Sequence, residues 1–391
     1  MPLISNQERR LRLVRRHHLG ATAPDAARAA ADLVALHSTD PVTPYLSLRA
    51  RVAGFAREDL DDALLSERSL LRLHAMRRTL FVVPTEDASV FQGAAAREIA
   101  ERERRRVEGW LVAESKGNAG EWLRSLEVKV MEELAHEGEL LTRDLPPRVE
   151  GLDTRITLGS GKWTSRVPLS SRLLFLLAME GRIVRTRPAG SWRSSQYRWA
   201  AVSRWLDIPR IEALPPADAR AELLHRYLAR FGPATLEDVR WWTGWTVARA
   251  RAAVTKVGAV EVKLEEGGRG MVLPGDEAEE SGGFELPVVA LLPALDPTIM
   301  GWKARNWYLG SHADALFDRN GNAGPTIWVD GRVVGGWGCL PSGGVGYRLL
   351  ESVGREAERA VAEEAAALTS WLAGEVVLPR FRTPLEKELA G

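Results

Sequence analysis

The sequence predicts a mainly helical α+β protein made of several modules. A chain of 391 residues is too long for one typical hydrophobic core. Along most of it, three helical segments followed by a strand pair recur, which is the order of a winged helix and indicates tandem winged-helix modules. The last quarter alternates strand-like runs with glycine turns and predicts a small β-barrel or curled sheet. The predicted ranges are 1–118, 119–206 and 207–276 for the modules and 284–391 for the sheet with its C-terminal helix.

The third module has the clearest pattern. "DARAELLHRYLARF" predicts an amphipathic helix, "TLEDVRWWTG" a short second helix and "WTVARARAAVTKV" a third. Thr235 is the expected N-cap of the second helix. "VEVKLEEGGRGMVLP" then predicts two strands, with "GGRG" at the tip of the hairpin.

The second module repeats this order. "EWLRSLEVKVMEELAHEG" predicts a helix, "LLTRDLPPRV" a short helix with a turn, and "SSRLLFLLAMEG" a third helix. "RIVRTRPAGSWRSSQYRWA" predicts a hairpin rich in arginine, a composition suited to phosphate contacts. Arginines on an exposed hairpin also serve solubility alone, so the sequence leaves both interpretations open.

A looser copy opens the chain. "NQERRLRLVRRHHL", "APDAARAAADLVALH" and "PYLSLRARVAGF" predict three helices, and "LRLHAMRRTLFVVP" predicts a later strand. The second helix is expected to stop at His37, and the third to begin at Pro41 or Pro44. Beyond the modules, "GDEAEESGG" predicts an exposed linker, and "REAERAVAEEAAALTSWLAG" a helix that stops at Gly374.

The composition is that of an ordinary globular protein, with 45% hydrophobic and 27% charged residues. The sequence contains no apolar run long enough to span a bilayer and no secretory signal pattern. Its single cysteine excludes an intramolecular disulfide framework and offers no zinc cluster. We therefore expect a cytoplasmic protein without a membrane partner, metal or cofactor. The excess of arginine over lysine in the basic segments suits phosphate binding, although GC-rich codon usage explains it equally well.

The tetrapeptide "HSTD", residues 37–40, places an imidazole, two hydroxyls and a carboxylate where two helices are expected to meet. Helix capping is one interpretation. Asp40 and Thr43 each precede a proline, as an N-cap does before proline at the first helical position. His37 would then end the preceding helix, where its C-terminal dipole favours a cation.

Four segments carry a resemblance to a known family. "LHSTDPVTPYLSLRARV", "MRRTLFVVPTED", "LLPALDPTIMGWKAR" and "GPTIWVDGRVVGGW" together resemble the bacterial winged-helix DNA glycosylases of the AlkZ/YcaQ type. The resemblance spans essentially the whole chain and implies tandem winged helices and a β-barrel arranged as a C around DNA. It also implies a monomer that acts on damaged double-stranded DNA. The implied reaction is monofunctional excision of alkylated purines such as N7-alkylguanine and N3-alkyladenine, with bulky adducts and interstrand crosslinks as further candidates.

Two departures from the family pattern stand out. His37, Ser38 and Thr39 occupy the positions of a Gln-apolar-Gln or Gln-apolar-Asp motif, and Arg78 and Phe81 replace a glycine and a histidine. In the family the first glutamine would position the water that attacks the sugar. A neutral imidazole with a pKa near ~6.5 is able to accept a proton from that water. His37 is therefore the first catalytic candidate, followed by Asp40 to orient it or stabilise the sugar cation, and by Thr39 to fix the water.

A larger set of residues is assigned to DNA contact. The candidates are Arg49, Arg51, Arg77, Arg78, Thr79, Lys162, Arg166, Arg172, Arg185, Arg187, Trp192, Arg193, Lys303 and Arg305. Asp296 and Trp302 lie in a segment that faces DNA in the family, and Asp296 alternatively caps a turn.

The alternative function is a non-catalytic winged-helix DNA-binding protein, either a transcription regulator or a damage-recognition paralogue. A regulator normally reads symmetric half-sites as a dimer. The sequence shows no coiled-coil heptads that would form such a dimer. Because the glutamine motif is missing, the sequence does not exclude a damage-recognition paralogue.

Overall fold

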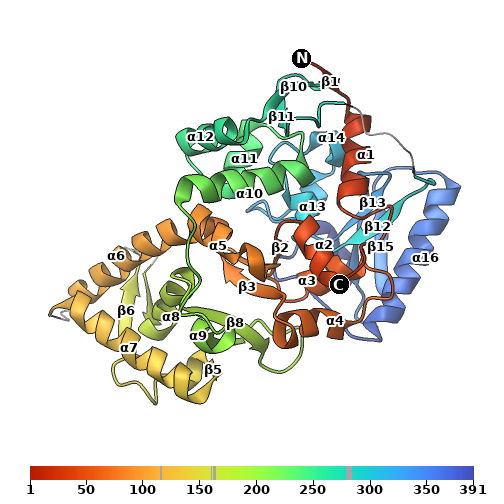
Figure 1. Ribbon diagram of the computed structural model, residues 1–391. Helices are drawn as coiled ribbons and strands as arrows, with labels where there is room; N and C mark the ends of the chain where they lie inside the picture. Colours follow the sequence, from red (N-terminus) through yellow and green to blue (C-terminus); the bar gives the residue numbers. More distant parts are fainter. Residues whose placement is uncertain (115–116, 160, 162–163, 279–283) are drawn as a thin grey trace. The chain divides into compact units, whose positions relative to one another are not determined.

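The computed structural model describes residues 1–114, 117–159, 161, 164–278 and 284–391 (Figure 1). The chain forms two compact units, one made of Met1–Ala63 with Ala221–Gly391 and the other of Leu64–Arg220. Both mix helices and strands, in agreement with the α+β prediction. This division is coarser than the four predicted ranges, which remain a prediction. In the described ranges, no helix is both long and apolar enough to cross a membrane.

The first unit begins with short helices. They are α1 (Asn6–Arg16), α2 (Ala26–Asp32), α3 (Thr43–Arg49) and α4 (Arg57–Asp61), followed by the π-helix η1 (Asp62–Ser66). The prediction that the second helix runs to His37 is wrong. Helix α2 ends at Asp32, Val34 adopts a positive φ of 65° that is incompatible with a helix, and His37 lies on the short strand β2 (Leu36–His37).

The elements predicted for residues 217–273 are present in order. They are α10 (Pro216–Phe231), α11 (Leu236–Thr243), α12 (Val247–Val257) and the antiparallel strands β10 (Val260–Leu264) and β11 (Arg269–Val272). Thr235 caps α11 as predicted: its hydroxyl accepts from the Asp238 N–H at 3.1 Å, and the Asp238 carboxylate accepts from the Thr235 N–H at 2.9 Å. Gly244 ends α11 with a φ of 74°, a left-handed conformation that glycine adopts without strain.

Strand β10 has a second partner that the sequence did not predict. The strand β1 (Leu3–Ile4) at the start of the chain pairs with it in parallel, with Ile4 opposite Leu264. The predicted linker 275–283 is only partly described, since residues 279–283 lie outside the described ranges. At its beginning, the Asp276 carboxylate accepts from Arg16 of α1 at 2.6 Å, so this portion is paired with the helix.

The C-terminal region of the first unit contains a four-stranded antiparallel sheet in the order β12-β13-β14-β15. Its strands are β12 (Val289–Leu292), β13 (Thr326–Val329), β14 (Arg332–Cys339) and β15 (Val345–Leu349). Among the described strands no pairing closes the sheet on itself, so it is open rather than a closed barrel. Helix α16 (Arg355–Leu372) packs on β12 and β15 (Figure 1). Helix α17 (Pro384–Ala390) packs on β14.

Three single-turn helices lie between β12 and β13. They are α13 (Pro297–Met300), α14 (Asn306–Leu309) and α15 (Ala313–Leu316). Trp302 follows α13 and is 2% exposed, and its indole N–H donates to the Phe231 carbonyl at 2.9 Å. Trp302 is therefore part of the core, and the prediction that it faces DNA is wrong.

The second unit combines helices with a sheet whose strands run in the order β4-β3-β8-β9-β5. The strands are β3 (Leu70–His74), β4 (Leu80–Pro84), β5 (Leu140–Leu141), β8 (Ile183–Pro188) and β9 (Tyr197–Ala201). The predicted arginine-rich hairpin is β8 with β9. Where the sequence predicted one strand near residue 80, the structure has the hairpin β3–β4.

The helices of the second unit pack their apolar faces together. They are α5 (Ala88–Phe91), α6 (Arg97–Ala113), α7 (Ala119–Glu137), α8 (Leu169–Met179) and α9 (Val202–Trp205). The unit also contains the 3-10 turns η2 (Met76–Arg78), η3 (Thr85–Asp87) and η5 (Thr142–Asp144) and the π-helix η4 (Gln92–Ala96). Leu123 of α7 and Leu173 and Leu177 of α8 lie at the centre of this core. A further hairpin of β6 (Arg155–Leu158) and β7 (Ser165–Pro168) precedes α8 and was not predicted.

The interior of the first unit contains an ion pair between Arg51 and Asp296, each with a side chain that is 0% exposed. Nη2 and Nη1 of Arg51 donate to the two carboxylate oxygens at 2.7 and 2.9 Å. The Ser47 hydroxyl donates to the same carboxylate at 2.6 Å, and Asp296 also accepts the Thr298 N–H as the N-cap of α13. The prediction that Arg51 contacts DNA is therefore wrong, because the guanidinium has no surface. The capping interpretation of Asp296 is confirmed.

His17 lies beside this ion pair and is completely buried. Nδ1 is 2.9 Å from the Thr298 hydroxyl and Nε2 is 3.2 Å from the Arg230 carbonyl. A carbonyl only accepts hydrogen bonds, so Nε2 must carry the proton that it donates to the Arg230 carbonyl. Nδ1 then accepts from the Thr298 hydroxyl, and the imidazole of His17 is neutral. Burial, with the Arg51 charge added, lowers the pKa of His17 to about 3.

Acid is expected to destabilise the protein through buried neutral histidines. In the second unit, burial and the Arg185 charge lower the pKa of His74 to about 3 as well. The unfolded chain binds these protons near pH 6.5 and the folded chain does not, so stability is complete above that pH and falls as the pH drops toward 3. Each histidine contributes a slope of about 1.4 kcal/mol per pH unit.

Urea unfolding at several pH values between 4.5 and 6.5 measures this slope. The His17→Gln variant should show a slope smaller by about 1.4 kcal/mol per pH unit, whatever its stability at neutral pH. An unchanged slope in that variant would show that His17 is not a neutral buried group.

Candidate functional site

Exposure alternates along the HSTD segment. His37 and Thr39 are half-buried, whereas Ser38 and Asp40 are 1% and 3% exposed. The extended strand β2 ends at His37, and the chain bends at Thr39 and Asp40. The structure therefore leaves the side chains of His37 and Thr39 partly accessible and buries that of Asp40.

Asp40 holds two segments of the first unit together. One carboxylate oxygen accepts from the Val42 N–H at 3.3 Å and the other from the Arg380 N–H at 2.9 Å. Burial raises the pKa of Asp40, and its hydrogen bonds to the Arg380 and Val42 backbones oppose this effect. Behind it lies a hollow of about 10 Å³, which is the size of one water molecule and excludes a purine base.

The two predictions that Asp40 or Thr43 is the N-cap of α3 are both wrong. The helix begins after Val42, and no side-chain hydrogen bond caps it. Thr43 lies inside the helix, and its hydroxyl donates to the Ala294 carbonyl at 2.8 Å. The polar residues before α3 thus connect the segment to distant parts of the chain instead of starting the helix.

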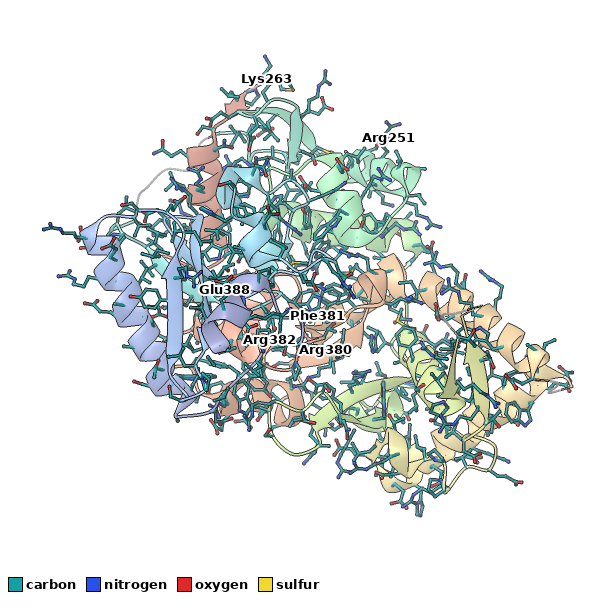
Figure 2. All side chains as sticks on the ribbon, turned by 180° about the vertical axis from the view of Figure 1, so that it is seen from behind. Arg251, Lys263, Arg380, Phe381, Arg382 and Glu388 are labelled. Carbon is teal, nitrogen blue, oxygen red and sulfur yellow. The ribbon has the colours of Figure 1, made fainter. Side chains whose placement is uncertain are left out.

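Arg380 is a residue of this site that the sequence did not indicate. Its backbone N–H binds Asp40, and its guanidinium Nη1 donates to the Thr39 carbonyl at 3.3 Å. The side chain is exposed and lies with Phe381 and Arg382 in the segment that precedes α17 (Figure 2). More than 300 residues separate Arg380 from Thr39, so no local pattern connects them.

The other predicted cations of the first unit are partnered. Arg49 forms an ion pair with Glu364 of α16. Lys303 donates to Glu237 at 2.5 Å. Arg305 donates to the Trp302 carbonyl at 2.8 Å and lies 4.7 Å from the Trp241 ring centroid. Nothing in these contacts tests their assignment to DNA, which remains a prediction.

The Arg77–Thr79 turn follows β3 and presents two exposed arginines. Arg78 pairs with Glu103 at 2.8 Å, and its φ is 64°. That left-handed conformation favours glycine, the residue that the family pattern has at this position. Phe81, at the position of the family's histidine, is 8% exposed on β4.

Of the predicted DNA-contact residues near the β8–β9 hairpin, some are exposed and others are buried or half-buried. Arg187 is exposed and pairs with Glu139 at 3.0 Å, and Arg193 is exposed on the loop. Arg166 on β7 is exposed, whereas Arg172 on α8 is half-buried. Trp192 is 8% exposed, which leaves little of its surface for the predicted DNA contact. Lys162 lies outside the described residues.

An open cavity of about 780 Å³ lies beside this hairpin in the second unit. Arg185 lines it, with its guanidinium carbon 4.8 Å from the Trp199 ring centroid. Arg143 and Arg155 add two exposed cations that the sequence did not single out, against one carboxylate, Asp153. The volume and the positive charge suit a nucleotide or its phosphate.

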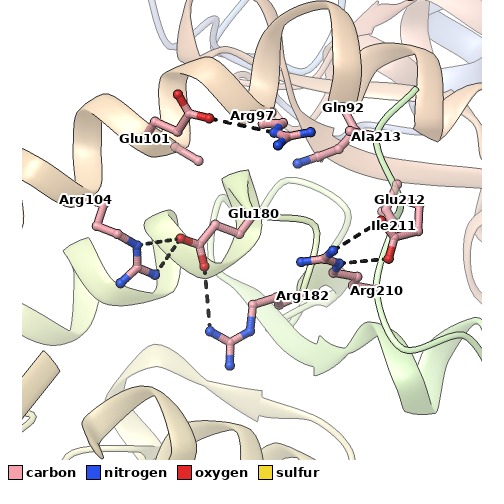
Figure 3. Close-up of a pocket in the computed structure, with 11 residues that line it drawn as sticks. Gln92, Arg97, Glu101, Arg104, Glu180, Arg182, Arg210, Ile211, Glu212 and Ala213 are labelled. Carbon is pink, nitrogen blue, oxygen red and sulfur yellow. Dashed lines mark hydrogen bonds and ion pairs between the residues drawn. The ribbon is translucent and has the colours of Figure 1, made fainter. Parts of the chain in front are cut away.

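A second cavity of the same unit, about 430 Å³, is internally neutralised (Figure 3). Arg104 donates to Glu180 at 2.5 Å and to Glu127 at 2.8 Å. Arg210 pairs with Glu212 at 2.9 Å, as the close-up shows. These pairs satisfy the arginines, so this cavity is a poor phosphate site. Within the described part of the chain, no cluster of three or more His, Cys, Asp or Glu side chains is placed to hold a metal ion.

Comparison with known proteins shows that the class of this protein is that of the DNA-repair glycosylases. Residues 30–371 match the family model described as "DNA glycosylase AlkZ-like", and the chain therefore belongs to the AlkZ-like DNA glycosylase family. The solved structure of Streptomyces sahachiroi DNA glycosylase AlkZ is similar, with a TM-score of 0.69 and 20% sequence identity over 97% of this chain and 99% of that chain. No curated protein sequence matches the chain.

Proposed function

We propose that this protein is a monofunctional DNA glycosylase that hydrolyses the N-glycosidic bond of alkylated purines, with His37 as the residue that positions or activates the attacking water. The observation that carries the proposal is the place of His37. It stands at the position of the family's first motif glutamine, and its side chain is half-buried. Such a place lets an imidazole reach a substrate while the protein shields it from bulk solvent.

The proposed reaction requires few catalytic groups from the protein. An N7- or N3-alkylated purine carries a positive charge and leaves without protonation, so no general acid is needed. The imidazole of His37 accepts a proton from the water as it attacks the anomeric carbon. The Thr39 hydroxyl holds that water, and Asp40 keeps the segment in place through its two backbone hydrogen bonds.

DNA binding is assigned to the helix–helix–helix–hairpin segments, which we interpret as winged-helix modules acting in a monomer on damaged duplex DNA. The positively charged cavity beside β8 and β9 supports this assignment. Arg185 in this cavity would meet the phosphate backbone together with Arg187 and Arg193 of the same hairpin, because phosphate contacts fix a protein on the duplex.

A base-release assay tests the proposed reaction. Duplex DNA containing one N7-methylguanine, one N3-methyladenine or one bulky N7-guanine adduct is incubated with the protein, and free base is quantified. We expect release of the modified base and an abasic strand that breaks only after alkali treatment, because a monofunctional enzyme does not cleave the backbone. Tight DNA binding without release from any of the three substrates would contradict the proposal.

The departure at residues 37–39 favours one alternative, a damage-recognition paralogue that does not cut. His37 and Thr39 stand where the family motif has glutamine and glutamine or aspartate. The same substrates distinguish the two functions, since a paralogue would bind lesion DNA more tightly than intact DNA and release no base. A footprint on one undamaged sequence would instead indicate a regulator.

A further inference from the structure

The segment just before α17 lies against the candidate site, and its contacts give Arg380 two separate links to it. The backbone N–H donates to Asp40 at 2.9 Å, and Nη1 donates to the Thr39 carbonyl at 3.3 Å. Arg380 also lies beyond residue 371, where the family match ends. The comparison therefore assigns it no role.

Arg380 differs from the neighbouring arginines in how its positive charge is paired. Arg382 pairs with the buried Glu386 at 2.7 Å, Arg49 pairs with Glu364, and Arg57 with Glu375. The guanidinium of Arg380 contacts a neutral carbonyl and lies 5.8 Å from the Phe381 ring centroid. In the part of the chain that the structure describes, it forms no ion pair, although its charge also acts on the nearby Asp40 carboxylate. An exposed positive charge therefore stands beside Thr39.

We propose that Arg380 binds a phosphate of the DNA strand next to the nucleotide whose base is removed. A guanidinium has five N–H donors, and the Thr39 carbonyl uses one, which leaves enough for a bidentate phosphate contact. Because the carbonyl already fixes the side chain, less conformational entropy is lost when the phosphate binds. This inference rests on the proposed function and names the contact that places the sugar at His37.

The two links of Arg380 are separable by mutation. The bond to Asp40 comes from the backbone and persists in any substitution except proline. Arg380→Ala therefore removes the guanidinium without releasing Asp40, and Arg380→Lys keeps the charge without the bidentate fork. Arg359→Ala is the matched control, because Arg359 is an exposed arginine on α16 whose contact is Glu363 at 3.6 Å.

Binding to lesion DNA is measured as a function of salt concentration. We expect Arg380→Ala to weaken binding about 10-fold at low salt and to lower the slope of log Kd against log salt by about 0.9, the value for one phosphate. Arg380→Lys should restore the slope, and Arg359→Ala should match the wild type. An unchanged slope in Arg380→Ala would overturn the proposal.

Neutral methylphosphonates locate the phosphate. Replacing the phosphates around the lesion one at a time should weaken wild-type binding at one flanking position and have no effect there on Arg380→Ala. Equal losses in both proteins at every position would overturn the inference. These readouts need no base release, so a protein that binds through Arg380 without excising a base contradicts the proposed reaction and leaves this contact established.

Discussion

Replacing His37 with alanine is expected to lower the rate of base release from alkylated DNA by about 10²–10⁴-fold, the usual contribution of a general base. The affinity for the same DNA should change by less than about threefold, because the half-buried imidazole acts on the water and not on the phosphate backbone. Single-turnover base release at saturating protein measures the chemical step, and a binding titration on the same duplex measures affinity.

Two neighbouring substitutions make this experiment specific. Ser38→Ala changes the next residue, whose side chain is buried away from solvent, and should leave the rate within a factor of about two. His37→Gln introduces the family's own residue and should retain more activity than alanine, since an amide positions water without accepting its proton. Equal rates for His37→Ala and the wild type would remove His37 from the mechanism and leave Thr39 as the candidate.

Replacing Arg51 with alanine is expected to lower the free energy of unfolding by about 3–5 kcal/mol, because the Asp296 carboxylate is left charged and unpaired in the core. Asp296 retains only the Ser47 hydroxyl and the Thr298 N–H, which do not replace a bidentate guanidinium. Urea unfolding followed by circular dichroism measures the change.

Two further variants distinguish the loss of the ion pair from the loss of side-chain volume as the cause of the lower free energy of unfolding. Removing both charges in Arg51→Met with Asp296→Leu should recover part of the loss, since a well-packed apolar pair carries no desolvation penalty. Arg49→Ala, two residues earlier, breaks a partly exposed pair with Glu364 and should cost about 1 kcal/mol or less. A loss below about 1 kcal/mol for Arg51→Ala would contradict the assignment of this pair to the core.

Arg49 and Arg51 also show why the sequence does not distinguish a partly exposed arginine from a buried one. Both are arginines on or just after one helix, and both had the same assignment. The side chain of Arg51 enters the core because Asp296, 245 residues away, is there to neutralise it. Burial of a charge depends on a partner that the fold supplies, so residue type and helical spacing do not reveal it.

Local signals predicted the helices and the hairpins well where they were strong. The Thr235 cap, the glycine after α11 and the alternating strands of residues 260–272 are short-range features, and the structure contains each of them. The signals failed at α2, where an apolar run continued past the true helix end at Asp32. An apolar run fits a buried strand as well as a helix, so composition did not distinguish them.

The sequence by itself determined the family of the protein, the order of its helices and hairpins, and His37 as the residue at the motif position. Those features depend on residues close together in the chain. The tertiary structure alone decided that His37 and Thr39 are half-buried, that Asp40 is buried as a link between two segments, and that Arg380 contacts Thr39 and Asp40. The contacts of Asp40 and Arg380 join segments hundreds of residues apart, and their free energy is gained only when the chain has folded.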